Sequence, residues 1–136
     1  MKVQNPETHE IHASEDVVMV RQAVRQRAVE LGFNLVDQTK IVTASSELAR
    51  NTLDYGGGGT LLLQTVQNGS KTGLHLTFED QGPGIPDIQQ ALKDGFTTGG
   101  GLGLGLGGAR RLSHEFEIQS EIGQGTRVTM VRWKGL

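Results

Sequence analysis

The sequence predicts an α+β fold, a two-layer α/β sandwich in which helices lie on one face of a mixed, mostly antiparallel sheet. Helical patterns come early in the chain, segments of alternating polar and apolar residues come late and in pairs, and glycine-rich turns separate them. A chain of 136 residues is long enough for one core and too short for two. We therefore expect a single domain over 1–136, with residues 1–8 loose.

The first half of the chain carries two amphipathic helices after a short strand at 10–13. Ser14 is expected to cap the first helix and Gly32 to end it. Its apolar stripe recurs every three or four residues: Val17, Val20, Val24, Ala28 and Leu31. Asp37 is expected to cap the second helix, which ends at Tyr55 and the glycines that follow. Its stripe consists of Ile41, Ala44 and Leu48.

The second half of the chain is expected to form the sheet. Two pairs of strands are predicted, each joined by a glycine-containing turn: 60–66 with 74–78, and 115–120 with 126–133. A short helix capped by Asp87 and a helix over 105–113 separate the two pairs.

Composition excludes several classes of protein. The formal net charge is −2 without a long basic run, so we expect no nucleic-acid partner. There is no cysteine, which excludes disulfide scaffolds and thiolate metal sites. No apolar stretch approaches the roughly 20 residues of a membrane span, and the first residues lack the apolar region of a signal peptide. We expect a cytoplasmic protein without membrane contact.

Glu47 and Asn51 lie four positions apart in the second predicted helix, so their side chains project from one face. The Asn51 carboxamide oxygen suits Mg²⁺, which keeps most of its waters and takes few protein ligands. A glutamate one turn earlier can orient or deprotonate a hydroxyl or a water near that metal. A polar helix face would carry the same pair, and only the glycine segments elsewhere favour a site.

The segment Asp80-Gln-Gly-Pro-Gly84 begins where a predicted strand ends. A carboxylate there can accept a hydrogen bond from the exocyclic amine of adenine, a donor that guanine does not offer at the same position. Gly82 and Gly84 would let the backbone approach a flat ring closely. The same residue types also form simple turns, which is the alternative interpretation.

The glycine run at 99–108 opens onto a predicted helix, an arrangement in which backbone N–H groups surround phosphates. It contains the dinucleotide spacing Gly103-x-Gly105-x-x-Gly108, but a polar turn rather than a strand precedes it, which excludes a Rossmann site. No Gly-Lys-Ser/Thr follows, which excludes a Walker loop. We interpret the run as a lid over a triphosphate rather than as a linker, because helix-forming residues follow directly.

Together these segments resemble the glycine and asparagine boxes of the GHKL ATPase superfamily, which includes gyrase, a major heat-shock chaperone, MutL and the catalytic domains of histidine kinases. Within it the chain looks most like the anti-sigma-factor serine kinase group, and there like the RsbT-type switch kinases of bacterial stress signalling. The similarity runs from about residue 10 to Trp133. Five segments carry it: 36–40, 46–51, 79–88, 94–98 and 111–116.

The resemblance implies a Bergerat-type sandwich that phosphorylates a serine with Mg-ATP, and it assigns roles by position. Glu47 becomes the catalytic base for the acceptor serine, Asn51 the Mg²⁺ ligand, and Asp80 the adenine-binding carboxylate. Thr126, at the start of the last strand, supports the base through water. The remaining cofactor-binding candidates shape the adenine pocket or form the phosphate lid: Gly82, Gly84, Ile85, Thr98, Gly101, Leu102, Gly103, Leu104, Gly105 and Gly107.

The resemblance also implies partners. The acceptor would be a STAS-domain antagonist, and the alternative target a PPM-type serine phosphatase; a stressosome-like complex and a homodimer are compatible with it. One alternative is a noncatalytic ATP-binding module of the anti-sigma or phosphatase-activating type, against which the presence of Glu47 argues. Another is a detached histidine-kinase catalytic domain, against which the absence of a phosphoacceptor helix argues.

Two positions depart from the relatives. A lysine that they tend to have in the turn after the asparagine helix is replaced here by the glycines at 56–59, and a proline late in the lid is replaced by Gly107. We expect both changes to loosen these loops.

Overall fold

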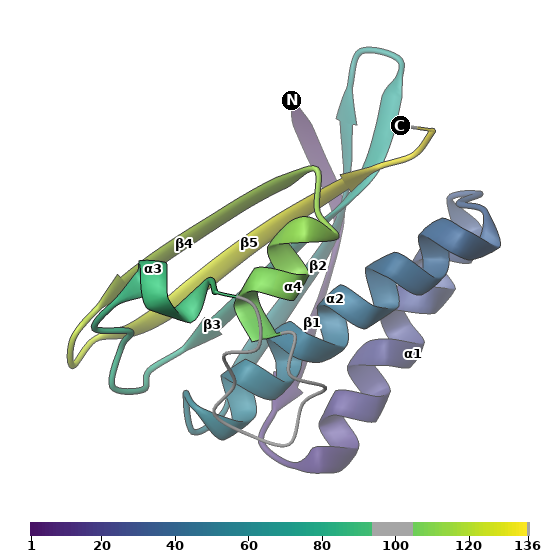
Figure 1. Ribbon diagram of the computed structural model, residues 1–136. Coiled ribbons are helices and arrows are strands. Elements are labelled where there is room, and N and C mark those ends of the chain that lie inside the picture. Colours follow the sequence, from purple (N-terminus) through teal and green to yellow (C-terminus); the bar gives the residue numbers. More distant parts are fainter. Residues whose placement is uncertain (94–104, 136) are drawn as a thin grey trace.

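The computed structural model describes residues 1–93 and 105–135, which form the predicted α+β sandwich of two layers (Figure 1). The described elements are, in chain order, β1 (Lys2–Ile11), α1 (Ser14–Glu30), α2 (Leu35–Asp54), β2 (Gly59–Asn68), β3 (Lys71–Asp80), α3 (Ile88–Ala91), α4 (Gly105–Arg111), β4 (Glu115–Glu121) and β5 (Gly125–Trp133). The sheet order is β1-β2-β3-β5-β4. Every described neighbouring pair is antiparallel, so the sheet is not mixed as we had predicted.

The helices lie on one face of the sheet, where α1 and α2 pack side by side and α4 lies next to α2 (Figure 1). The predicted helical stripes, from Val17 to Ala28 in α1 and from Ile41 to Leu48 in α2, are buried. Alternate strand residues meet them from the sheet: Leu61, Leu63, Leu74, Leu76, Phe78, Val128 and Met130. This alternation places the core between the two layers and confirms the two strand pairs.

The caps of α1 and α2 differ from those predicted. The Asp16 carboxylate accepts from the backbone N–H of His12, at 2.8 Å, and of Ala13, at 3.1 Å, so Asp16 rather than Ser14 stabilises the start of α1. Asn34 caps α2 by accepting from the N–H of Asp37 at 2.8 Å. The helix begins at Leu35 because the Asn34 cap precedes it; Leu35 and Val36 are exposed and so take no part in the buried stripe that predicted the helix.

The N-terminal residues are not loose, since β1 pairs with β2 along its length. Its register shifts near Asn5, which has a φ of +55°. On the helix side, the Arg27 guanidinium of α1 donates to the Glu7 carboxylate at 3.1 Å and to the Thr65 hydroxyl at 3.2 Å. Apart from Ile11, most residues of this edge strand are polar or exposed, so no alternating apolar pattern marked it in the sequence. Pairing with β2 and the Arg27 contact hold it in place.

A buried ion pair anchors the N-terminal end of α2 to the last strand. The Arg132 guanidinium of β5 donates to the Asp37 carboxylate at 2.9 Å and to the Leu112 carbonyl at 2.8 Å. The two charged side chains are 8% and 14% exposed, respectively. Loss of one partner would leave the other charge buried without its counterion.

We expect Asp37→Ala to lower the free energy of unfolding by about 3 kcal/mol, because Arg132 would stay buried without its carboxylate. Denaturant unfolding of the apo protein measures this loss. The matched control is Glu79→Ala, which breaks the exposed pair with Arg127 and should change stability by less than about 1 kcal/mol. Equal losses in the two variants would show that burial of the first pair has no energetic consequence.

Candidate nucleotide site

The C-terminal half of α2 holds the predicted base and metal ligand. Glu47 is buried and Asn51 is half-buried, one helical turn apart, as the spacing predicted. The helix ends just beyond them, where the N–H groups of Tyr55 and Gly56 both donate to the Asn51 carbonyl at 3.1 Å. This C-terminal turn brings the glycine segment directly back toward the sheet.

Asp80 is the last residue of β3, and its side chain is buried at 5% exposure. One carboxylate oxygen, Oδ1, accepts from the backbone N–H of Gly82 at 2.9 Å. Burial raises the pKa of the Asp80 carboxyl above its usual 3.8, although the backbone N–H groups of Gly82 and Thr126 act in the opposite direction. The end of β3 therefore presents a desolvated acceptor, which an N–H donor on a ligand would satisfy.

The turn after α2 reaches Asp80 at Gly56, a glycine that the sequence predicted as part of a helix end and of a loosened turn. A Cβ atom added at Gly56 would lie 2.4 Å from Cγ and 2.5 Å from Oδ2 of Asp80. A Cβ atom added at Gly82 would lie 2.7 Å from the Cα atom of Gly56. At Gly56 the glycine turn is therefore tightly packed, because its backbone fills the space that a side chain would take, whereas a Cβ atom at Gly57 would meet nothing within 4 Å.

Gly84 lacks a side chain for a reason that the sequence did not indicate. Its φ is +80°, and a Cβ atom there would lie 2.3 Å from the carbonyl oxygen of Glu121 at the end of β4. The glycine therefore lets the loop after Asp80 rest on the β4–β5 hairpin. Close approach to a flat ring is not needed to explain it.

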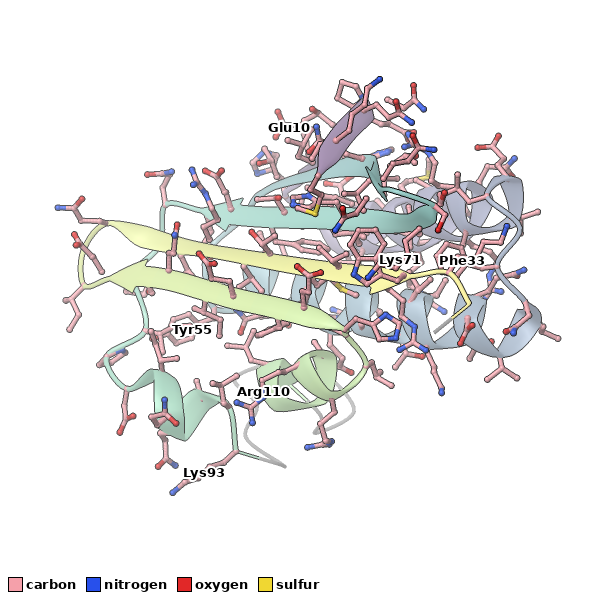
Figure 2. All side chains as sticks on the ribbon, turned by 90° about the horizontal axis from the view of Figure 1, so that it is seen from above. Glu10, Phe33, Tyr55, Lys71, Lys93 and Arg110 are labelled. Atoms are coloured by element: carbon pink, nitrogen blue, oxygen red, sulfur yellow. The ribbon has the colours of Figure 1, made fainter. Side chains whose placement is uncertain are left out.

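Three hydroxyl groups connect this loop to its surroundings. Ile85 donates its N–H to the Ser120 Oγ atom at 2.8 Å, and the same atom lies 2.8 Å from Thr126 Oγ1. The Tyr55 hydroxyl donates to the Gly84 carbonyl at 2.7 Å. Figure 2 shows Tyr55 on the helix-covered side of the sheet, together with α3 and α4.

The sequence analysis missed Ser120 and Tyr55 as site residues. Ser120 had a usable signal, because the predicted hairpin around 123–125 places it opposite Thr126, and the two are register partners in the structure. Tyr55 had none, since its partner at Gly84 lies 29 positions away.

The lid lies partly outside the described residues, which exclude the candidates Thr98, Gly101, Leu102, Gly103 and Leu104. Gly105 and Gly107 belong to α4. A Cβ atom at Gly107 would lie 2.1 Å from the Leu92 carbonyl oxygen, so this glycine allows α4 to pack against the end of α3. That Gly107 loosens the lid stays a prediction, because residues 98–104 of the lid lie outside the described part of the chain.

Asp80 and Thr126 also border an open hollow of about 650 Å³, which extends to Ile88 and Ile118. Within 1–93 and 105–135, no group of three or more His, Asp or Glu side chains could hold a metal ion by itself. No described helix is long and apolar enough to cross a membrane.

Comparisons with known proteins agree with this geometry. A family model for histidine kinase-, DNA gyrase B- and HSP90-like ATPases matches residues 36–134. The chain is 50% identical over 118 residues to the serine/threonine-protein kinase RsbT of Bacillus subtilis, an alignment that covers 87% of this chain and 89% of the relative. It is 30% identical over 123 residues to the anti-sigma F factor of Geobacillus kaustophilus, which covers 85% and 82%.

Two solved structures share the fold. The RsbU and RsbW domains of a Mycobacterium tuberculosis protein superpose with a TM-score of 0.62 at 20% identity, over 95% of this chain and 32% of that one. A mycobacterial sensor histidine kinase, MprB, gives a TM-score of 0.54 at 18% identity, over 96% and 98%. The family model over 36–134, together with the 50% identity to a serine/threonine-protein kinase, shows that the chain belongs to the family of histidine kinase-, DNA gyrase B- and HSP90-like (GHKL) ATPases.

Proposed function

We propose that this chain is an Mg-ATP-dependent serine/threonine-protein kinase that acts as a partner switch in bacterial stress and sigma-factor regulation. The observation that carries the proposal is the contact of the Gly56 backbone with the buried Asp80 carboxylate, at the end of the helix that holds Glu47 and Asn51. The 50% identity to a serine/threonine-protein kinase supports it.

The adenine end of the site is supported by the chemistry of Asp80. Its carboxylate is desolvated, and the backbone of Gly56 and Gly82 packs so closely around it that no further side chain fits there. An exocyclic amine would donate to this acceptor, whereas the carbonyl of guanine would face it without a hydrogen bond. We therefore propose adenine rather than guanine nucleotides, with Thr126 beside the base.

The metal end is supported by the donor set. Asn51 offers a carboxamide oxygen, and Mg²⁺ bound to nucleotide phosphates takes one or two protein ligands rather than a cage of carboxylates. When bound, ATP would supply the phosphoryl group, and the Mg²⁺ ion would neutralise charge on the leaving diphosphate. The lid candidates at 101–107 are proposed to contact the phosphates.

Glu47 is proposed to accept the proton from the hydroxyl of the acceptor serine. The serine oxygen forms the new bond to the γ-phosphorus, the bond from that phosphorus to the bridging oxygen breaks, and ADP leaves. Because Glu47 is buried on α2, one turn from Asn51, its carboxylate is held in a fixed relation to the metal ligand.

The proposed acceptor is a serine of a STAS-domain antagonist. Its phosphorylation would place a charge of about −2 in the interface and lower the affinity. The released chain would then bind a second target, for which we propose a PPM-type phosphatase. The name of the anti-sigma F factor relatives, at 27–30% identity, is consistent with binding of regulatory proteins.

We expect Glu47→Ala to reduce phosphoryl transfer by about 10²- to 10⁴-fold, because the acceptor hydroxyl would lose its base. The measurement mixes the protein with ATP labelled at the γ-phosphate and candidate STAS proteins from the same genome. Asp54→Asn, an exposed acid on the same helix, is the matched control and should leave transfer unchanged.

The same assay tests the noncatalytic alternative. If the unmodified chain binds ATP but labels none of the candidates, an ATP-binding module becomes the better description. Label on one STAS protein that persists in Glu47→Ala would contradict the role of Glu47 while keeping the kinase.

We expect Asp80→Asn to raise the melting temperature of the apo protein by a few degrees at pH 7 and to abolish ATP binding. The pKa of Asp80 is raised in the folded state, so its contribution to stability is complete below pH 3.8 and is lost as the pH rises through the folded value. The difference in melting temperature between Asp80→Asn and the parent protein should therefore become smaller as the pH is lowered toward 4. Thermal melts between pH 4 and 7, with Glu79→Gln as control, measure this; a less stable variant at pH 7 would contradict the desolvation argument.

A further inference from the structure

The peptide group between Gly84 and Ile85 is held at both of its polar atoms. Its carbonyl oxygen accepts from the Tyr55 hydroxyl at 2.7 Å, and its N–H donates to the Ser120 Oγ atom at 2.8 Å. Tyr55 is the C-cap of α2, and Ser120 belongs to β4. One peptide group thus joins the helix of the proposed base to the strand pair that carries Thr126.

The surrounding backbone leaves this peptide group little freedom. Gly84 has a φ of +80°, which residues with side chains rarely adopt, and it lies against the Glu121 carbonyl. Between the end of β3 and α3 the loop joins no ladder of backbone hydrogen bonds, and one backbone bond, from the Gly123 N–H to the Pro83 carbonyl at 2.8 Å, ties it to the β4–β5 hairpin. The next peptide group, between Gly84 and Ile85, is bound by side chains, the hydroxyls of Tyr55 and Ser120.

Ser120 also determines what the Thr126 hydroxyl presents to a ligand. A serine hydroxyl has one proton, and Ser120 Oγ lies 3.2 Å from the Gly125 carbonyl and 2.8 Å from Thr126 Oγ1. If Ser120 donates to Gly125, Thr126 donates to Ser120 and offers only acceptor positions elsewhere. If Ser120 donates to Thr126, the Thr126 proton is free. Without Ser120 neither arrangement is fixed.

We propose that Tyr55 and Ser120 are positioning residues that clamp the Gly84–Ile85 peptide group and thereby fix the adenine loop and the Thr126 hydroxyl for recognition of the base. The proposal rests on the ATP site proposed above. It predicts that both hydroxyls affect nucleotide affinity and base selectivity, and that both act through the Gly84–Ile85 peptide group.

The test compares Ser120→Val with Ser120→Thr, two side chains of the same shape that differ by the hydroxyl, and adds Tyr55→Phe and the double variant Tyr55→Phe/Ser120→Val. Titration calorimetry measures the Kd of Mg-ATP and of Mg-GTP. We expect Ser120→Val to bind ATP about three- to tenfold more weakly than Ser120→Thr, the range for one lost hydrogen bond. Tyr55→Phe should weaken ATP binding similarly, and the double variant should lose less than the product of the single effects.

Selectivity separates positioning from simple stabilisation of the fold. We expect loss of the Ser120 hydroxyl to lower the preference for ATP over GTP. The same loss should change KM more than it changes kcat at saturating ATP. Equal ATP affinity of the Val and Thr variants, or equal weakening of ATP and GTP, would overturn the clamp. A parent protein that binds no ATP would instead overturn the proposed function on which the clamp rests.

Discussion

The approach of the Gly56 backbone to the Asp80 carboxylate is the constraint on which the site depends. A Cβ atom at Gly56 would overlap that carboxylate, and one at Gly82 would overlap Gly56, so two backbone segments and one carboxylate meet where no further side chain fits. Because Gly56 follows α2 directly, this packing also fixes where Glu47 and Asn51 lie relative to the end of β3. Backbone contacts are stiffer than contacts between long side chains, which suits a site that needs fixed distances.

Burial of Asp80 connects stability with selectivity. A desolvated carboxylate with few donors destabilises the empty fold, and in the proposed site the same property would reject a base that brings no amine, because the acceptor would stay unsatisfied. Stability is supplied away from the pocket, by the apolar contacts between helices and sheet and by the Asp37–Arg132 pair at the opposite end of α2. The helix is thus anchored at its N-terminal end and carries the proposed chemistry at its C-terminal end.

Periodicity was sufficient for the parts of the fold whose residues face one core. The stripe from Val17 to Ala28 and the alternation around Leu76 predicted both layers. It failed for β1, which is stabilised by pairing and by Arg27, and for the glycines, whose packing partners lie elsewhere in the chain. The candidate site was predictable where motifs concentrate, as at Asp80, but the bonds of Tyr55 required the folded chain.

The site divides into two sets of residues with different requirements. In the proposed assignment Asp80, Gly82 and Thr126 bind the base, which a binding module would also need. Glu47 and Asn51 are assigned to the transfer and lie on another element, α2. The Gly56 contact and the Tyr55 bond to Gly84 join the sets through backbone atoms and one hydroxyl, none of which involves the Glu47 side chain. A kinase and a binding module would both need the base pocket, so ATP binding alone does not distinguish them, whereas dependence of transfer on Glu47 does.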